Sequence, residues 1–364
     1  MRSPIVCSLL LLAAGCRTTP LPPLFGAEPA DHLIRTGEVH FARLWKLTSG
    51  GENAEGYWSF AGDRLVYQAR NAKRGVECDR IYVTGPGGPD EMGGPGPRQV
   101  SNGRGKTTCA YFLPDDQRVL FSSTHAVQAG CPPPPDFSKG YVWDVHPEFD
   151  VFEVDLASGE ERVLLDGTGY DAEATVSPRG DRIVFTSSRS GDLELWTCDL
   201  DGSNLFQVTD DLGYDGGAFF SHDGRMLVYR RTAFTPGREE EEHARYRELL
   251  ADWKVQPSRM EIMVIGADGS NRRQVTRLEA ASFAPFFFPD DTRILFSSNF
   301  QSGGSGRNFD LFAVDVDGTD LERVTWEETF DSFPMFSPDG RYLAFASNRG
   351  GEPGETNLFV AEWR

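Results

Sequence analysis

One short pattern recurs along the chain and constrains the fold more than any other feature. Its clearest copy is SPDGRYLAF, which begins at Ser337. A Pro-Asp-Gly turn followed by an apolar run is a strong β-hairpin signal. Related copies begin at Ser59, Leu113, Ser177, Ser221 and Phe288. The chain therefore contains six related hairpin units.

Each hairpin is followed by a third β-prone run, a tight turn and a fourth run that ends in Val-Thr or a similar pair. The unit that begins at Ser177 continues with ELWT from Glu194, the turn Asp201-Gly202 and the pair Val208-Thr209. Four short antiparallel strands in about 44 residues are typical of a β-propeller blade. The sequence therefore predicts an all-β, six-bladed β-propeller.

The ends of the chain suggest how the ring closes. The chain stops at Arg364, after the third strand of the sixth unit, and that unit lacks a fourth strand. The segment RLWKLT, which begins at Arg43, matches ERVT, which begins at Glu322. Because an open ring would leave strand edges unpaired, we expect this N-terminal strand to complete the last blade.

The repeat SPDGR, with DGSN and Val-Thr downstream, resembles the PD40 (WD40-like) repeat of the TolB-like six-bladed propellers. The resemblance covers roughly residues 43–364 and implies the fold. TolB proteins carry an α/β domain ahead of the propeller, where this chain offers only a tether. The resemblance therefore implies a stand-alone lipoprotein form.

The N-terminus has the features of a targeting segment. Arg2 precedes a short apolar run that ends LAAGC at Cys16, and this run is too short to span a bilayer. LAAGC resembles a bacterial lipobox, which implies a signal peptide over 1–15 and a lipid anchor on Cys16. An ordinary secretory signal is the alternative. Residues 16–41 are Pro-rich and predict a tether, which leaves 42–364 for the propeller.

The charge and the motifs narrow the function. The net charge is −19, which disfavours nucleic acid and anionic lipid as partners, so we expect the lipid anchor to be the only contact with a membrane. Neither Gly-x-Ser-x-Gly nor His-Glu-x-x-His occurs in the sequence. We therefore predict a non-enzymatic protein without cofactor or metal, and a monomer.

Blade topology places the Pro-Asp-Gly turns on one face and the variable segments on the other, which is the expected ligand face. The position six residues ahead of each hairpin repeats around that channel mouth, and three of its occupants are acids. We predict a ligand-binding mouth for a basic peptide or a cation. Its candidate residues are Asp171, Glu173, Asp215, Asp331, Tyr170, Tyr214 and Phe330. The alternative is that these acids accept backbone hydrogen bonds and fix the loops.

Four cysteines remain after the signal segment, and three of them lie near blades 1 and 2. A disulfide between Cys109 and Cys131 would hold the long insertion over 124–148, and Cys78 with Cys109 is the alternative pair. Cys198 lies within a strand and is expected to be a buried thiol.

Blade 4 carries the largest insertion, from Gly237 to Pro257. Tyr246, Leu249, Leu250 and Trp253 are spaced as one apolar stripe of a helix. We expect a helix that packs on the blade, or one that serves as a lid or docking element.

Together these features predict an exported periplasmic lipoprotein. Arg17 after the lipidated cysteine favours the outer membrane, because an Asp there is associated with retention in the inner membrane. The predicted partner is an envelope protein or peptide. The rival hypothesis is a hydrolase or hydrolase accessory with a metal or catalytic site at the channel mouth.

Overall fold

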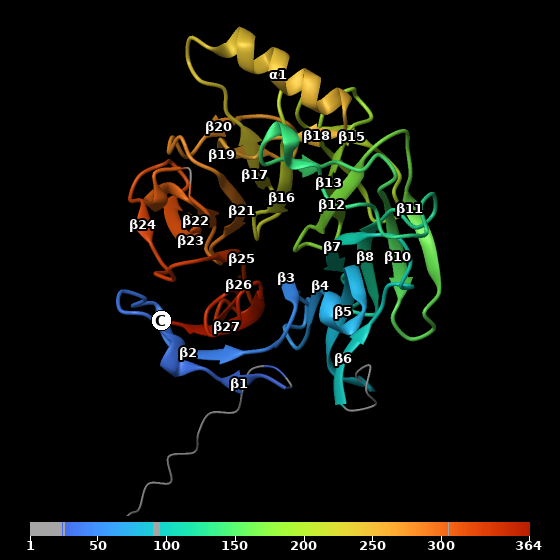
Figure 1. Cartoon of the computed structure of the whole chain (residues 1–364), viewed down its shortest axis with the longest axis vertical. Helices are drawn as coiled ribbons and strands as arrows, with labels where there is room; N and C mark the ends of the chain where they lie inside the picture. The colour runs from blue at the N-terminus through green and yellow to red at the C-terminus, as the bar shows by residue number, and fades with distance from the viewer. Residues whose placement is uncertain (1–23, 25, 90–94, 305) are drawn as a thin grey trace, which may run out of the picture.

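The computed structural model describes residue 24 and residues 26–89, 95–304 and 306–364. Six antiparallel sheets surround a common axis, and the first strand of each lies nearest the centre (Figure 1). This confirms the predicted six-bladed, all-β propeller. The predicted signal peptide over 1–15 and the anchor Cys16 lie outside the described residues.

In each blade the first strand is innermost and the last strand is outermost. Blade 1 comprises β3 (Glu52–Trp58), β4 (Leu65–Asn71), β5 (Val76–Pro89) and β6 (Pro95–Gln99). Blade 2 comprises β7 (Thr107–Phe112), β8 (Arg118–Ser123), β10 (Asp150–Asp155) and β11 (Glu161–Leu165). Blade 3 comprises β12 (Asp171–Val176), β13 (Arg182–Ser187), β14 (Glu194–Asp199) and β15 (Phe206–Gln207).

Blade 4 comprises β16 (Asp215–Phe220), β17 (Met226–Thr232), β19 (Met260–Gly266) and β20 (Arg273–Gln274). Blade 5 comprises β21 (Ser282–Phe287), β22 (Arg293–Ser298), β23 (Asp310–Asp315) and β24 (Glu322–Arg323). Blade 6 comprises β25 (Asp331–Phe336), β26 (Tyr342–Ser347), β27 (Asn357–Trp363), β2 (Phe41–Lys46) and β1 (Glu28–Pro29).

The Val-Thr pairs have a defined structural role. The hydroxyl of Thr209 accepts a hydrogen bond from the backbone N–H of Leu195 at 2.9 Å, so the fourth strand is attached to the third. Thr276 and Thr325 accept equivalent bonds at 2.8 Å in blades 4 and 5. A small hydroxyl is needed because it replaces a backbone acceptor inside a buried sheet. This recurrence explains why the pair marks the end of a blade.

The N-terminal strand closes the ring, as predicted. Strand β2 pairs with β27, with Leu44 opposite Ala361, and it lies beside β27 in Figure 1. Thr48 accepts a bond from the N–H of Leu358 at 2.9 Å, in the role that Thr209 has in blade 3. The two ends of the propeller are therefore held in one sheet.

The predicted tether over 16–41 is wrong for its second half. Residues 26–41 lie against the propeller, where β1 pairs with β2 and a 3-10 helix spans Asp31–Leu33. Ala27 and Ala30 are buried, and Glu38 is buried in an ion pair with Arg349. Composition suggested a tether because residues 16–41 are Pro-rich, but a buried salt bridge and a strand pairing hold residues 26–41 in place.

Two insertions meet above blade 3. The insertion of blade 2 contains a 3-10 helix (Phe137–Lys139) and β9 (Trp143–Asp144), and that of blade 4 contains α1 (Glu239–Ala251) and β18 (Lys254–Val255). Strands β9 and β18 pair with each other. The remaining 3-10 helices span Ala72–Arg74 and Phe300–Ser302.

The predicted helical insertion is confirmed, with one difference in its apolar stripe. Tyr246 and Leu249 are buried, whereas Trp253 follows the end of α1 and is 38% exposed. Trp253 has a φ of 54°, which no helix accommodates. The helix packs on blade 3 through Tyr246, whose hydroxyl donates at 2.5 Å to Asp192 in the connection between β13 and β14.

Candidate functional site

Every innermost strand contains a β-bulge at the same position. In blade 3 the strand register shifts between Ala172 and Thr175, and an equivalent shift occurs in each of the other five blades. The bulged residue has a left-handed backbone conformation in all six blades, with φ between 50° and 60°. A bulge adds one residue to a strand and redirects its side chains. Side chains two residues apart therefore need not share a face here.

The bulges separate three rings of side chains around the axis. The first ring is Asn53, Thr107, Asp171, Asp215, Ser282 and Asp331. The second ring, at the bulges, is Glu55, Cys109, Glu173, Gly217, Ala284 and Phe333. The third ring is Tyr57, Tyr111, Thr175, Phe219, Phe286 and Met335. Each ring has a different role.

The third ring fills the axis toward the Pro-Asp-Gly face. The ring centroid of Phe219 lies 5.3 Å from that of Tyr57 and 5.2 Å from that of Phe286. Tyr57 and Phe219 come from blades 1 and 4, so side chains meet across the centre. The aromatic side chains of the third ring form a plug across the axis, and this aromatic plug is the floor of a cavity.

The second ring surrounds a cavity of about 340 Å³ on the side of the aromatic plug away from the Pro-Asp-Gly turns. All six of its residues line this cavity, together with Tyr141 and Trp143 from the insertion of blade 2. Glycine at position 217 is required because an added Cβ would overlap the guanidinium of Arg230. The cavity is the candidate functional site.

The acids of the first ring do not line the cavity, which corrects the prediction for Asp171, Asp215 and Asp331. All three are buried, and each faces an arginine that lies within the second strand of its blade or two residues after that strand ends. The side chains are 2.9 Å apart in Asp171–Arg189 and Asp331–Arg349, and 3.7 Å apart in Asp215–Arg231. These acids therefore have a structural role, but their partners are arginines and not the backbone N–H groups that the alternative prediction named.

Burial is the main influence on these acids. It raises the pKa of Asp215 to about 7, although Arg231 and Arg272 oppose this. Burial also raises the pKa of Asp331, against the attraction of Arg349. Arg349 also donates to Glu38, at 2.9 and 3.0 Å. One buried cation therefore holds together the start of β25, where Asp331 lies, and the N-terminal segment that contains Glu38.

The other predicted residues, Glu173, Tyr170, Tyr214 and Phe330, do line the cavity. Glu173 accepts bonds from Arg230 at 2.5 Å, from the hydroxyl of Tyr214 at 2.8 Å and from Thr186 at 2.7 Å. Burial opposes its ionisation, but Arg230 and these hydroxyls outweigh burial, so the pKa of Glu173 lies below its usual value. Glu173 is therefore an ionised, fully occupied acceptor.

Glu55 lines the cavity at the second-ring position of blade 1 and was not among the predicted site residues. Burial raises its pKa to about 7, while a hydrogen bond from the thiol of Cys109 lowers it. Its Oε2 atom is shielded from solvent and accepts no hydrogen bond from any residue that the structure describes. The sequence contained one signal for this ring: glycine at the aligned position in blade 4, which indicated an unusual backbone conformation.

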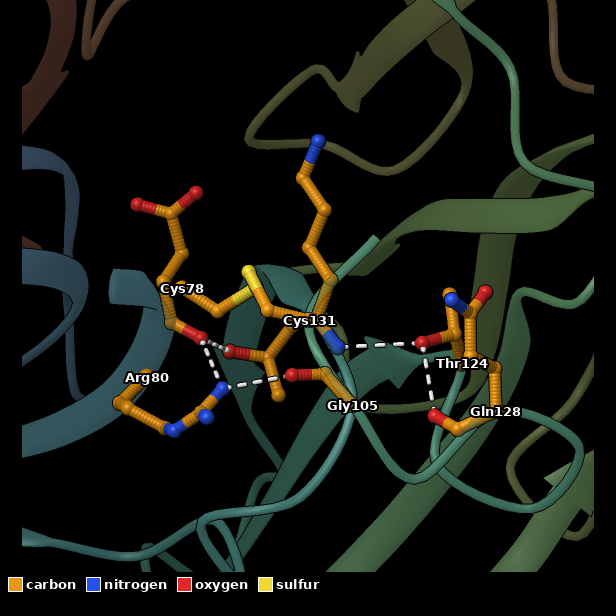
Figure 2. Close-up of a disulfide and its surroundings, with 9 residues drawn as sticks. Cys78, Arg80, Gly105, Thr124, Gln128 and Cys131 are labelled. Carbon is orange, nitrogen blue, oxygen red and sulfur yellow. Dashed lines mark hydrogen bonds between the residues drawn. A yellow bond between two sulfur atoms is a disulfide. The ribbon is translucent and has the colours of Figure 1, made fainter. Parts of the chain in front are cut away.

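The insertion of blade 2 is tied to blade 1 by a disulfide between Cys78 and Cys131, with the Cα atoms 5.7 Å apart (Figure 2). Neither predicted pair, Cys109–Cys131 or Cys78–Cys109, is formed. Cys109 is instead a free thiol inside the cavity, because the bulge turns it toward the axis. Cys198 is a free, buried thiol, as predicted.

Hydrogen bonds beside the disulfide order the start of the insertion. Arg80 donates to the carbonyl of Gly105 at 2.7 Å, and Thr124 donates to the carbonyl of Gln128 at 3.4 Å (Figure 2). At the far end, β9 pairs with β18, and Lys254 lies 3.5 Å from Asp144. The insertion is thus held at both ends, and Tyr141 and Trp143 are fixed over the cavity.

Two further properties concern the described residues only. Within them, no three His, Cys, Asp or Glu side chains are close enough together to hold a metal ion. None of their helices has the length and apolar character that crossing a membrane requires.

Comparison with known sequences gives partial matches. No family model matches the chain. An uncharacterized protein of Agrobacterium fabrum is 35% identical over 81 residues, which is 22% of this chain and 28% of that protein. A TolB homolog of Chlorobium luteolum is 27% identical over 144 residues, or 33% of this chain and 32% of that protein. The matches thus span about a third of the length of these relatives.

Comparison with solved structures extends over most of the chain. A TolB of Agrobacterium tumefaciens has a TM-score of 0.52 at 15% identity and covers 86% of this chain and 91% of that one. A gluconolactonase of Xanthomonas campestris has a TM-score of 0.54 at 16% identity, covering 96% and 100%. An oligogalacturonate lyase has 0.51 at 14%, covering 93% and 96%. With relatives named TolB in both comparisons and six blades in the structure, the chain has the fold of a TolB-like six-bladed β-propeller.

Proposed function

We propose that this chain is a non-enzymatic, lipid-anchored propeller of the cell envelope that binds a segment of a protein or peptide partner in the cavity. The cavity is the observation that carries the proposal. It is closed below by the aromatic plug, open on the face that bears the insertions, and walled by aromatic side chains. A pocket of that kind holds the side chains of an inserted segment rather than a flat surface.

The likeness to TolB proteins and the lipobox-like LAAGC support the envelope location. The strongly acidic composition supports a partner with a basic segment, because complementary charge accelerates encounter and favours the correct partner. The insertions support specificity, because they place Tyr141 and Trp143 at the entrance where a partner segment would pass. Aromatic side chains are common anchors of protein interfaces.

The test fills the cavity without removing a charge. Ala284 belongs to the second ring, and Phe333 occupies the equivalent position in blade 6 with nearly the same φ, 55° against 50°. Ala284→Phe therefore introduces a side chain that this backbone conformation already holds elsewhere. Ala157→Phe, on an exposed turn, is the matched control.

The full-length chain, carrying a photo-crosslinking amino acid at position 330, is incubated with solubilised envelopes. We expect the same crosslinked partner with the parent protein and with Ala157→Phe, and its loss with Ala284→Phe. A partner that survives Ala284→Phe would show that binding occurs elsewhere on the propeller. No crosslinked protein in any sample would contradict a partner-binding cavity.

An enzyme is the second candidate, and the free thiol of Cys109 beside Glu55 is the observation that favours it. The similar folds of a lyase and a gluconolactonase show that such propellers support catalysis in other proteins. Against a thiolate nucleophile, burial raises the pKa of Cys109 well above its usual value, so the thiol stays protonated near neutral pH.

Two measurements separate the candidates. Metal analysis of the purified full-length protein, with hydrolase and lyase assays on ester, lactone, peptide and uronate substrates, should find no turnover that responds to Cys109→Ser or Glu55→Gln. Turnover that both substitutions abolish would establish the enzyme and overturn the binding proposal.

A further inference from the structure

The cavity has two unlike halves. Its polar half comes from blades 1 to 4 and contains Glu55, Glu173 and Arg230. Its other half is a continuous set of aromatic rings, with centroids 6.0 Å apart in Trp143–Phe283, 5.9 Å in Phe283–Phe333 and 6.3 Å in Phe330–Phe333. A ligand that matches both halves has an apolar stem and a polar or charged end.

The charges of the residues that line the cavity show which kind of polar end a matching ligand has. Arg230 is neutralised by Glu173, and its guanidinium stacks on the ring of Tyr214 at 4.6 Å. Asp144 has Lys254 as its partner. Glu55 has no cation in contact, so it is the one carboxylate of the wall whose negative charge no salt bridge in the described chain compensates.

The hydrogen bonding of Glu55 favours an ammonium over a guanidinium. A guanidinium binds best when it can donate to both oxygens of a carboxylate, whereas an ammonium acts as a point charge. The Cys109 thiol already donates to Glu55, and Oε2 is the oxygen left without a donor among the described residues. With the thiol on one oxygen, the carboxylate can offer the other to a single N–H donor once the Glu55 side chain turns that shielded oxygen into the cavity.

We propose that the cavity binds a primary ammonium on an apolar stem, as in a lysine side chain, with Glu55 as its counter-ion and Phe283, Phe330 and Phe333 around the stem. This inference rests on the proposed function, since the lysine would belong to the inserted segment of the partner. It names the side chain that the cavity selects. Aromatic faces attract a nearby cation in addition to covering the stem.

Binding of a cation should be coupled to a proton. Burial is the largest influence on Glu55 and raises its pKa, as do the charges of Glu173 and Asp79, whereas the hydrogen bond from Cys109 and the charge of Arg230 lower it. With a pKa of about 7, Glu55 is partly protonated at neutral pH. A bound ammonium favours the charged form, so the site releases a proton and binds more tightly as the pH rises from 6 to 8.

The experiment uses isothermal titration calorimetry of the full-length protein in detergent with Nα-acetyl-lysine methylamide. The acetyl-norleucine and acetyl-glutamate methylamides serve as neutral and anionic probes. We expect binding of the lysine probe only, at least about tenfold weaker in Glu55→Gln at pH 8, and unchanged in Glu160→Gln, which removes an exposed carboxylate. Two buffers of different ionisation enthalpy should reveal proton release at pH 7.

Several outcomes would overturn the inference. These are equal binding of the norleucine probe, unchanged affinity in Glu55→Gln, or affinity independent of pH in the parent protein. The last measurement needs no variant, so it remains decisive if Glu55→Gln folds poorly. If the crosslinked partner is lost with Ala284→Phe while no lysine probe binds, the proposed function stands and this inference fails.

Discussion

The first and second rings lie two residues apart on the same strands, yet they do opposite things. First-ring acids such as Asp331 are buried against arginines and hold the blades together. Second-ring residues such as Glu55 and Glu173 line the cavity. The bulge is the cause, because each second-ring residue is itself the bulged residue, and its positive φ turns its own side chain toward the axis. Stability and recognition are thus separated within a single strand.

The largest expected effect comes from removing the arginine that pairs with a first-ring acid. Arg349→Met should lower the free energy of unfolding by about 3–5 kcal/mol, because it leaves Asp331 and Glu38 as buried, unpaired charges. Arg341→Met removes an exposed pair with Glu362, with side chains 58% and 23% exposed, and should cost less than about 1 kcal/mol. Denaturant unfolding compares the two. Equal losses would remove the distinction between the first ring and the surface.

Removing the disulfide tests whether the insertion of blade 2, which contributes to the cavity and not to the first ring, depends on this bond. Replacing Cys78 and Cys131 together with Ser should lower the free energy of unfolding by about 2–4 kcal/mol, because it frees the closed loop in the unfolded chain. Limited proteolysis should then cut within 124–141, and reduced parent protein should give the same fragments. Resistance to proteolysis would show that β9 pairing alone holds the insertion.

Gly217→Ala tests the bulge itself. The substitution adds the strain of a positive φ and a clash with Arg230, so we expect a loss of about 2–3 kcal/mol. Gly237 has a φ of 83° and open space where a Cβ would lie. Gly237→Ala should therefore show the backbone strain alone, a loss of about 1 kcal/mol in the free energy of unfolding. Thermal unfolding separates clash from strain. Similar losses would mean that Arg230 adapts and that the second ring is not tightly packed.

The smallest effect concerns pH and the second ring. The pKa of Glu55 is raised in the folded protein, to about 7, so its contribution to stability is full at low pH and is lost as the pH rises through 7. The slope is at most about 1.4 kcal/mol per pH unit. Between pH 5 and 8, Glu55→Gln should flatten the stability profile, whereas Glu160→Gln should not. A parallel profile in both variants would place Glu55 in contact with solvent.

The fold was predictable because its signals are local. The turn after Ser337, the apolar run after it and the terminal Val-Thr pairs each act within a few residues, and their sixfold repetition requires a closed ring. The same logic placed Arg43 to Thr48 in the last blade, because a missing strand and a spare strand have matching sequences. Tyr170, Tyr214, Phe330 and Glu173, chosen from their position in the repeat, line the cavity, and their binding of a ligand stays a prediction.

What the sequence could not decide was the direction of side chains and the choice of partners. Asp171, Asp215 and Asp331 were predicted at the mouth because their position in the repeat recurs around it, and a regular strand would place them on one face with the residues two further along. The bulge breaks that rule, and it leaves little trace beyond glycine at position 217. Likewise, Cys131 pairs with Cys78 because the insertion folds back on blade 1 while Cys109 turns inward. Spacing along the chain sets which elements form, but only their packing sets which atoms meet.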